Sequence, residues 1–228
     1  MRHSIVATIV ASLVIVYATP SQAESNLFGL ELRVRPLLSY AKFGSSHFEG
    51  AMGESTGTYS KKEDTFIGGF AASVVRSWGP WRGELEYAWR YRTDINGRVE
   101  YADYTATARN NLQNTSLTFN TYRSFGQSQS FKPYLMAGAG IVKHSSDTEV
   151  FYSDQMYPDE HRDNLETQLT FHGGAGVEMQ LDSGWTIDAG YRYADLGKAS
   201  TAPFSHGISL TTGKLTNHDV ILSLRKRY

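Results

Sequence analysis

The chain has 228 residues and a formal net charge of −1, and it contains no cysteine. The near-neutral charge excludes the basic surface expected of a nucleic-acid-binding protein, and the absence of cysteine excludes a disulfide framework. Aromatic residues make up 13% of the sequence, yet the mean hydropathy is −0.38. This combination is typical of a β-barrel, because apolar residues at every second position are hidden by averaged hydropathy.

The N-terminal segment has the features of a secretory signal peptide. Arg2 and His3 precede an apolar run over residues 5–17, and Ser21-Gln22-Ala23 has the small-x-small form that signal peptidase cleaves. The run is shorter than the ~20 residues that a membrane-spanning helix needs. We predict that residues 1–23 are a signal peptide, cleaved after Ala23, and that residues 24–228 form one exported domain.

The mature sequence alternates between apolar and polar residues with a period of two, which indicates β-strands. The first segment, 28–35, places Phe28, Leu30, Leu32 and Val34 on one face. The segment 81–92 repeats the pattern with aromatic residues on one face and charged residues on the other. Alternation recurs over 168–179, 185–193 and 219–228, where Ile221 interrupts the polar face. With less certain facing, 65–76, 112–125 and 132–143 complete eight predicted strands.

The connections between these strands alternate in length. Three are tight turns, at residues 77–80, 126–130 and 182–184, with the Gly, Pro, Ser and Asp that turns require. Four are long and polar, at residues 43–64, 93–111, 144–166 and 195–217. The sequence therefore predicts an all-β protein, a closed eight-stranded antiparallel up-and-down transmembrane β-barrel with short periplasmic turns and four long extracellular loops. Pro36 is expected at a bulge or at the bilayer edge, because proline removes a ladder donor.

The alternation also predicts which side chains face lipid and which face the lumen. A soluble barrel or sandwich is the alternative, but the aromatic row over 81–91 is too bulky for the interior of an eight-stranded barrel. The predicted lipid-facing residues are Leu30, Leu32, Leu85, Tyr87, Trp89, Phe171, Ile187, Tyr191, Leu222 and Leu224. The predicted lumen polar network consists of Glu31, Arg33, Glu84, Glu86, Arg90, Glu178, Asp188, Arg192 and Arg225. Buried charges require partners, so we expect Arg–carboxylate pairs that fill the lumen.

Several short motifs resemble those of the opacity-protein-like, eight-stranded outer-membrane β-barrel family, also called porin family proteins or surface antigens. They are Lys132-Pro133-Tyr134 leading to Gly138-Ala139-Gly140, Gly173-Gly174-Ala175-Gly176-Val177, Gly184-Trp185 leading to Gly190-Tyr191-Arg192-Tyr193, and the C-terminal segment 218–228. The resemblance implies a cell outer membrane protein in contact with lipid and lipopolysaccharide. It also implies that Val220, Leu222, Leu224 and Tyr228 form a signal for the barrel-assembly machinery, with Lys226 departing from the family pattern.

The sequence contains no convincing catalytic or cofactor motif. Ser205, His206, Ser209 and Asp195 offer hydrolase-like residue types but lie in a predicted loop without a nucleophile elbow. His47, His144, His161 and His206 fall in separate predicted loops without metal-ligand spacing, so no cofactor or metal is expected.

The expected function is therefore that of a non-enzymatic surface barrel for envelope integrity, adhesion or antigen presentation. A narrow channel for small solutes and a lipid A-modifying enzyme are the alternatives. Tyr101, Tyr104, Tyr152 and Tyr157 are candidate loop contacts for a host or surface ligand, because aromatic residues in polar loops often anchor partners. Packing of these rings between loops would explain them equally well.

Overall fold

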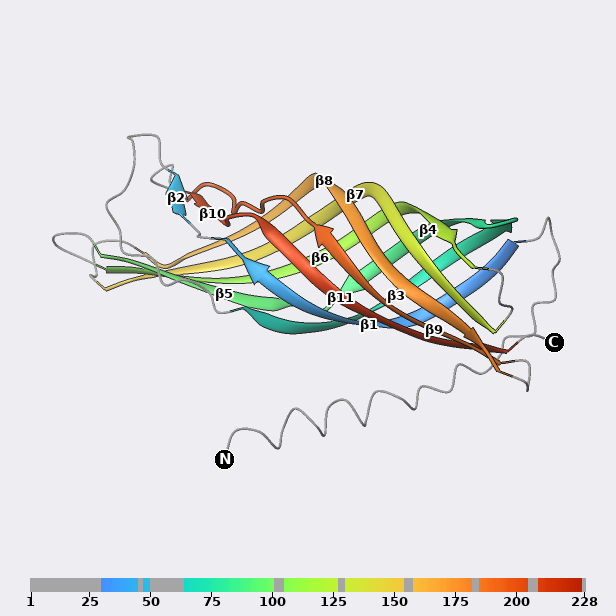
Figure 1. Cartoon of the computed structure of the whole chain (residues 1–228). Coiled ribbons are helices and arrows are strands. Elements are labelled where there is room, and N and C mark those ends of the chain that lie inside the picture. Colours follow the sequence, from blue (N-terminus) through green and yellow to red (C-terminus); the bar gives the residue numbers. More distant parts are fainter. Residues whose placement is uncertain are drawn as a thin grey trace, which may run out of the picture.

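The computed structural model describes residues 30–44, 47–49, 64–100, 105–126, 130–153, 158–181, 185–204 and 209–226. These residues form a barrel that is elongated along its axis (Figure 1). The predicted signal peptide lies outside the described residues. The strands are β1 Leu30–Phe43, β2 His47–Glu49, β3 Thr65–Trp78, β4 Trp81–Arg90, β5 Thr93–Glu100, β6 Thr105–Ser124, β7 Phe131–Tyr152, β8 Glu160–Gln180, β9 Trp185–Asp195, β10 Ser209–Thr211 and β11 Leu215–Lys226. Among the described residues, no helix is long and apolar enough to cross a membrane.

Antiparallel pairing closes the main sheet into a ring of eight strands. The order runs β4-β3-β1-β11-β9-β8-β7-β6, and β4 pairs with β6 to complete the circle. β5 follows β4 after the two residues Tyr91 and Arg92 and pairs with the same neighbour, β6, so the two act as one interrupted strand. The predicted eight-stranded barrel is confirmed.

The first and last strands of the ring pair over a shorter stretch than most neighbours. The β1–β11 ladder runs from Leu38↔Val220 to Phe43↔Leu215, whereas β1 pairs with β3 from Leu30 onward. Pro36 lies two residues before the β1–β11 ladder begins. Because proline has no backbone N–H to donate, it fits this unpaired side of β1.

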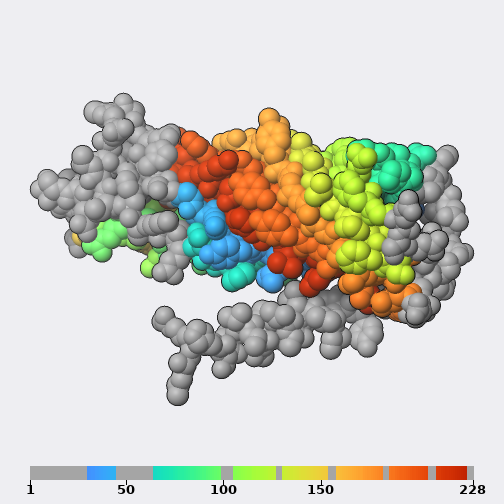
Figure 2. All heavy atoms as spheres, in the orientation of Figure 1, coloured from blue at the N-terminus to red at the C-terminus, as the bar shows by residue number. Residues whose placement is uncertain are grey.

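Side chains alternate between the outside and the inside along every strand of the ring, as period-two sequences require. The structure also gives the facing of the three segments whose orientation the sequence left open. Outward-facing residues there are Phe66, Phe70, Val74, Leu117, Phe119, Leu135 and Ile141; inward-facing residues are Ile67, Ala71, Val75, Thr118, Asn120, Tyr122, Tyr134, Met136 and Val142. The wall is continuous on the face seen in Figure 2, where spheres of neighbouring strands touch.

At one end of the barrel, short turns join consecutive strands. β3 and β4 are joined by the two residues Gly79 and Pro80, and Gly79 has a φ of 58°. Only glycine adopts this left-handed conformation without steric cost, which explains its position in the turn. We call this the turn end.

At the opposite end, the prediction of four long loops is wrong for two of them. Most of residues 93–111 belongs to β5 and β6, and most of residues 144–166 belongs to β7 and β8. At this end β5, β6, β7 and β8 extend further than β1, β3, β9 and β11 and form a projecting sheet (Figure 1). The projecting sheet consists of residues 93–100, 105–112, 144–152 and 160–169. The prediction failed because most outward-facing residues here are polar, so these strands lack the continuous apolar stripe found lower in the barrel.

A segment between β9 and β11 covers the inward face of the projecting sheet. Residues 196–204 and 209–214, including the short strand β10, fold back over the barrel mouth, and β10 pairs with β2. Phe204 and Leu210 of this segment pack against Ala106, Ala108 and Val150 of the sheet. The inward face of β5, β6 and β7 in the projecting sheet is therefore mostly buried against protein rather than exposed to solvent.

Candidate functional site

The outside of the barrel carries a band of exposed apolar side chains. Leu32 is 66% exposed and Leu222 is 54% exposed, although both are apolar and lie in regular strands. Of the ten residues predicted to face lipid, eight are exposed and two, Trp89 and Ile187, are half-buried. Trp89 packs against Phe70 and Tyr91, with ring centroids 5.2 and 4.7 Å apart. An apolar band of this size is unusual on a protein surface that contacts water.

The middle of the lumen is filled by a cluster of ion pairs. Arg192 donates from Nη1 to Glu86 at 2.7 Å and from Nε and Nη2 to Asp219 at 2.9 and 2.7 Å. Arg35 contacts the same Glu86 and also Glu84, the latter at 3.1 Å. All these side chains are buried, and Arg192 is 0% exposed. Each carboxylate thus has at least one guanidinium partner, which a buried charge needs.

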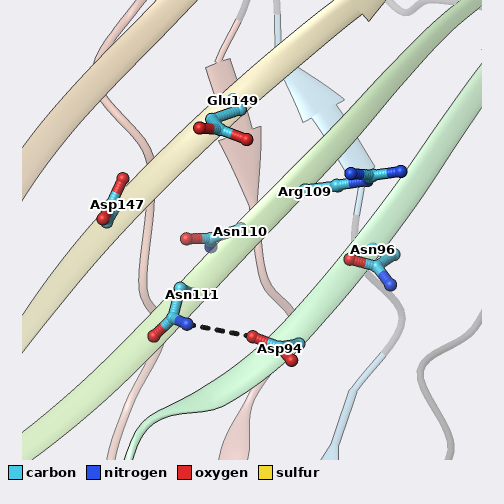
Figure 3. Close-up of a pocket in the computed structure, with 7 residues that line it drawn as sticks. All are labelled: Asp94, Asn96, Arg109, Asn110, Asn111, Asp147 and Glu149. Atoms are coloured by element: carbon cyan, nitrogen blue, oxygen red, sulfur yellow. Dashed lines mark hydrogen bonds between the residues drawn. The ribbon is translucent and has the colours of Figure 1, made fainter.

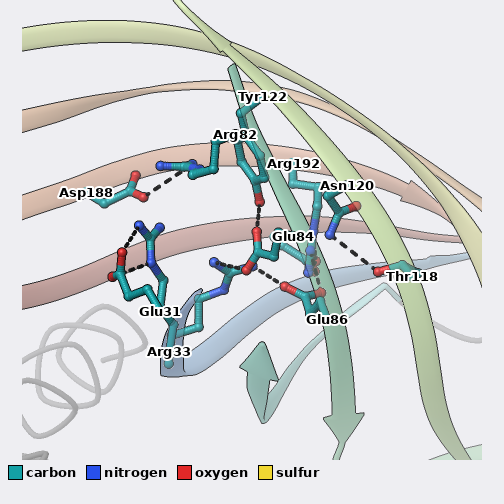
Figure 4. A network of polar contacts seen from close by, with 12 residues as sticks. Glu31, Arg33, Arg82, Glu84, Glu86, Thr118, Asn120, Tyr122, Asp188 and Arg192 are labelled. Carbon is teal, nitrogen blue, oxygen red and sulfur yellow. Dashed lines mark hydrogen bonds and ion pairs between the residues drawn. The ribbon is translucent and has the colours of Figure 1, made fainter. Parts of the chain in front are cut away.

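Further contacts connect this cluster to the barrel wall. Arg90 donates to Asp219 at 3.0 Å, and Ser39 donates to the other oxygen of the same carboxylate at 2.5 Å. We call Arg35, Glu84, Glu86, Arg90, Arg192 and Asp219 the ionic cluster; part of it is drawn in Figure 4. These six residues come from β1, β4, β9 and β11, so the cluster ties together strands on different sides of the lumen.

A second group of polar contacts extends the ionic cluster toward the turn end. Tyr122 donates its hydroxyl proton to Glu84, and Tyr134 donates to Asp188 at 2.8 Å. Arg82 pairs with Glu178, and its guanidinium carbon lies 3.9 Å from the centroid of the Tyr122 ring. The stacked arginine and tyrosine fill space that would otherwise admit water.

Two neighbouring glycines explain why Tyr134 fits in the lumen. Gly176 and Gly190 are paired across β8 and β9, and a Cβ atom at either one would lie 2.4 or 2.5 Å from the Tyr134 hydroxyl oxygen. Both belong to glycine-containing motifs that the sequence shares with the opacity-like family. Their role here is to leave room for the phenol that hydrogen-bonds Asp188.

Above the ionic cluster, an apolar plug closes the mouth of the barrel. Its members are buried and come from the ring, from β5 and from the segment after β9: Ala41, Phe43, Ile67, Ile95, Leu112, Val142, Ala194, Leu196, Ala199 and Leu215. His144 holds the segment in place, because its Nε2 lies 2.8 Å from the Leu196 carbonyl and its Nδ1 lies 2.6 Å from Asn114 Oδ1. Burial in this apolar setting lowers the His144 pKa below its usual 6.5.

The structure brings most of the predicted lumen residues together, with two qualifications. Glu31 and Arg33 pair with each other at 2.7 Å, but Glu31 is partly exposed. The side chain of Arg225 lies outside the described part of the chain. Sequence reasoning also left out Arg35, Arg82 and Asp219, although all three lie on the polar face of their strands. Their position on that face was the available signal.

Of the four tyrosines predicted as loop contacts, the structure describes only Tyr152. Tyr152 lies at the end of β7 and packs against the apolar cluster of the projecting sheet, so it is not a free loop contact. The alternation of side chains along β7 places Tyr152 on the inward side of the strand, where burial is favourable. Tyr101, Tyr104 and Tyr157 lie outside the described residues, as do Tyr228, Ser205 and His206.

Over β5, β6 and the end of β7, the outward face of the projecting sheet is mainly polar and carries a shallow cavity of about 520 Å³ (Figure 3). Cross-strand register aligns its side chains in two rows. One row is Asp94, Asn111, Asp147 and Asp163; the next is Asn96, Arg109, Glu149 and His161. Asn111 donates from its amide nitrogen to Asp94 at 3.0 Å. The sheet thus offers hydrogen-bonding groups at fixed spacing on a rigid support.

A closed eight-stranded ring with an apolar outside and a charged, paired inside defines a transmembrane β-barrel. Residues 9–225 match the family model of the outer membrane protein beta-barrel domain, and the chain belongs to this family. It is therefore a protein of the cell outer membrane of Gram-negative bacteria.

The individual proteins that this chain resembles share less than a third of their aligned residues with it. Outer membrane protein PagN of Salmonella typhimurium is 29% identical over 128 residues, which are 53% of this chain and 52% of PagN. The chain thus spans about half the length of the curated relative it matches. The crystal structure of OprG from Pseudomonas aeruginosa aligns with a TM-score of 0.51 at 13% identity, covering 87% of this chain and 96% of OprG, and shows a shared fold. Neisserial surface protein A aligns over 85% of this chain and 98% of its own, at 16% identity and a TM-score of 0.40.

Proposed function

We propose that this protein is a non-enzymatic surface scaffold. Its sealed barrel anchors the projecting sheet outside the cell, where the sheet contacts a host or surface ligand in adhesion or envelope maintenance. The observation that carries the proposal is the filled lumen. The ionic cluster and the apolar plug occupy the interior at successive levels. A rigid scaffold that presents binding segments is a common use of such folds.

In this proposal the exposed apolar band contacts lipid and the acyl chains of lipopolysaccharide. Val220, Leu222 and Leu224 are exposed along β11. With the aromatic Tyr228 of the sequence, they would be read by the barrel-assembly machinery during insertion. The polar outward face of the projecting sheet would remain above the membrane, because its carboxylates and amides have no place in hydrocarbon.

The narrow-channel alternative predicts ion flow through the lumen. Purified protein inserted into planar bilayers is expected to give no steady conductance, because buried ion pairs and the apolar plug occupy the lumen. Reproducible, salt-dependent conductance steps would contradict the scaffold proposal. The lipid A-modifying alternative is tested by lipid A mass profiles of expressing and non-expressing cells, which we expect to be identical.

Adhesion is tested by display of the chain on Escherichia coli and measurement of adherence to epithelial cells and matrix proteins. The double variant Arg109→Ala/Glu149→Ala changes the projecting sheet without changing net charge. The matched control, Lys214→Ala/Asp195→Asn, removes a partly exposed ion pair outside that sheet. We expect adherence to fall to the vector level in the first variant and to persist in the control. Equal adherence of wild type and vector would contradict the proposal.

A further inference from the structure

Three side chains on the outward face of the projecting sheet point to a metal site. Asp147 of β7 and His161 and Asp163 of β8 each offer one ligand atom, and these atoms lie within 4.8 Å of one another. The sequence placed Asp147, His161 and Asp163 in a loop, but the structure places them on paired strands. His161 and Asp163 are two residues apart on one strand and therefore share a face. Asp147 is the cross-strand partner of Asp163.

The His161 ring lies near both carboxylates but too far from either for an ordinary hydrogen bond. His161 Nδ1 lies 3.5 Å from Asp147 Oδ1, and His161 Nε2 lies 3.6 Å from Asp163 Oδ1. Hydrogen bonds of this kind are ordinarily about 2.7–3.2 Å long. The two His161 distances start from different ring nitrogens, and only one of those nitrogens can bind an ion shared with both carboxylates. Two ligands of a tetrahedral zinc ion, with bonds of about 2.0–2.1 Å, lie about 3.3 Å apart. One imidazole nitrogen and one oxygen of each carboxylate lie within 4.8 Å of one another, and side-chain rotation on this exposed face would bring them to a common ion.

An independent observation at the neighbouring position supports a cation. Asn111 is the cross-strand partner of Asp147, and its Oδ1 atom exposes less than 1 Å² yet accepts no hydrogen bond. Its amide nitrogen donates to Asp94 at 3.0 Å, and that contact leaves the oxygen without a donor (Figure 3). A buried acceptor without a donor is costly. Like charges placed directly opposite, as Asp147 and Asp163 are, also destabilise a sheet. A bound cation would give the Asn111 oxygen a partner and would reduce the repulsion between the two carboxylates.

We propose that Asp147, His161 and Asp163 bind a divalent first-row transition metal of the Zn²⁺ type, with Asn111 Oδ1 or water completing the shell. The imidazole favours this class, because Ca²⁺ and Mg²⁺ prefer shells made of oxygen. The ion would join β7 to β8 on the exposed face of the projecting sheet. The site is independent of whether that sheet binds a surface ligand.

The test is isothermal titration of ZnCl₂ into the purified, folded, metal-free barrel in detergent without lipopolysaccharide. We expect one saturable site in the wild type. His161→Ala and Asp163→Asn should each weaken binding by about 10–100-fold or more, since even the loss of an outer partner of a metal ligand costs that much. Asp195→Asn, which removes a carboxylate outside the projecting sheet, should bind as the wild type does.

Co²⁺ provides a second readout, because its visible absorption reports imidazole and carboxylate coordination. We expect this spectrum in the wild type and not in His161→Ala. The proposal is overturned if the wild type binds no Zn²⁺ up to about 1 mM. It is also overturned if His161→Ala binds as tightly as the wild type, or if Ca²⁺ competes equally with Zn²⁺. Unboiled gel mobility of each variant shows that the barrel is folded.

Discussion

The lumen and the projecting sheet of this protein use charged residues in opposite ways. In the lumen, four arginines and five carboxylates are buried, and the contacts among them join strands across the barrel. On the outward face of the projecting sheet, charges such as Arg109, Glu149 and Asp163 are exposed and lie on neighbouring strands. The comparison teaches that burial decides whether a charge supports the fold or is free to meet a ligand, because water screens exposed pairs.

The largest expected effect comes from breaking the ionic cluster. Arg192→Met removes the guanidinium that joins Glu86 to Asp219, and we expect a loss of about 3–5 kcal/mol of stability, because buried carboxylates lose a partner. Urea unfolding of the protein in lipid vesicles, followed by tryptophan fluorescence, measures the change. Arg109→Met on the projecting sheet is the control and should cost no more than about 1 kcal/mol. Equal losses in the two variants would contradict the comparison.

A smaller effect is expected where backbone packing supports the lumen. Gly190→Ala places a methyl group against the Tyr134 hydroxyl and should displace the phenol from Asp188, at a cost of about 1–3 kcal/mol. The double variant Gly190→Ala/Tyr134→Phe tests the cause. If the clash involves the hydroxyl, the two substitutions should cost less together than the sum of their separate effects. Strict additivity would show that Gly190 matters for another reason.

The junction between the lumen and the projecting sheet should be sensitive to pH. Burial lowers the pKa of His144, with Glu166 acting in the opposite direction. The unfolded chain then binds a proton more readily than the folded one, so stability should fall as the pH drops below about 6.5, by at most about 1.4 kcal/mol per pH unit. Urea unfolding at pH 7.5 and 5.5 measures this loss. His144→Gln should reduce the pH dependence, and an unchanged dependence would exclude His144 as its source.

The smallest effect on global stability is expected from the segment that covers the projecting sheet. Phe204→Ala removes a buried ring that packs against Ala106 and Val150. Because Phe204 lies outside the ring of eight strands, the boiled and unboiled gel mobilities should remain as in the wild type. Limited proteolysis should cut faster between residues 196 and 214, since that segment loses its anchor. Loss of the unboiled gel shift would show that the segment supports the whole barrel.

Much of the fold could be predicted from alternation alone, and the reason differs between elements. Over residues 81–90 the two faces differ so strongly that register and facing follow directly from the period of two. Over residues 105–111 and 144–152 the outward face is mainly polar and the inward face mixes small, polar and apolar residues, so the same rule predicted loops where the structure has strands. What makes those strands stable is the segment with Phe204 and Leu210, which is distant in sequence and packs on their inward face.

By itself the sequence determined the barrel class, the eight strands of the ring and most of the charged residues in the lumen, because these depend on local periodicity. Only the tertiary structure decided which arginine meets which carboxylate, that an apolar plug with Leu196 closes the mouth, and that Asp147, His161 and Asp163 lie together. Those outcomes depend on strand register and on contacts between distant segments. Local alternation carries no information about either.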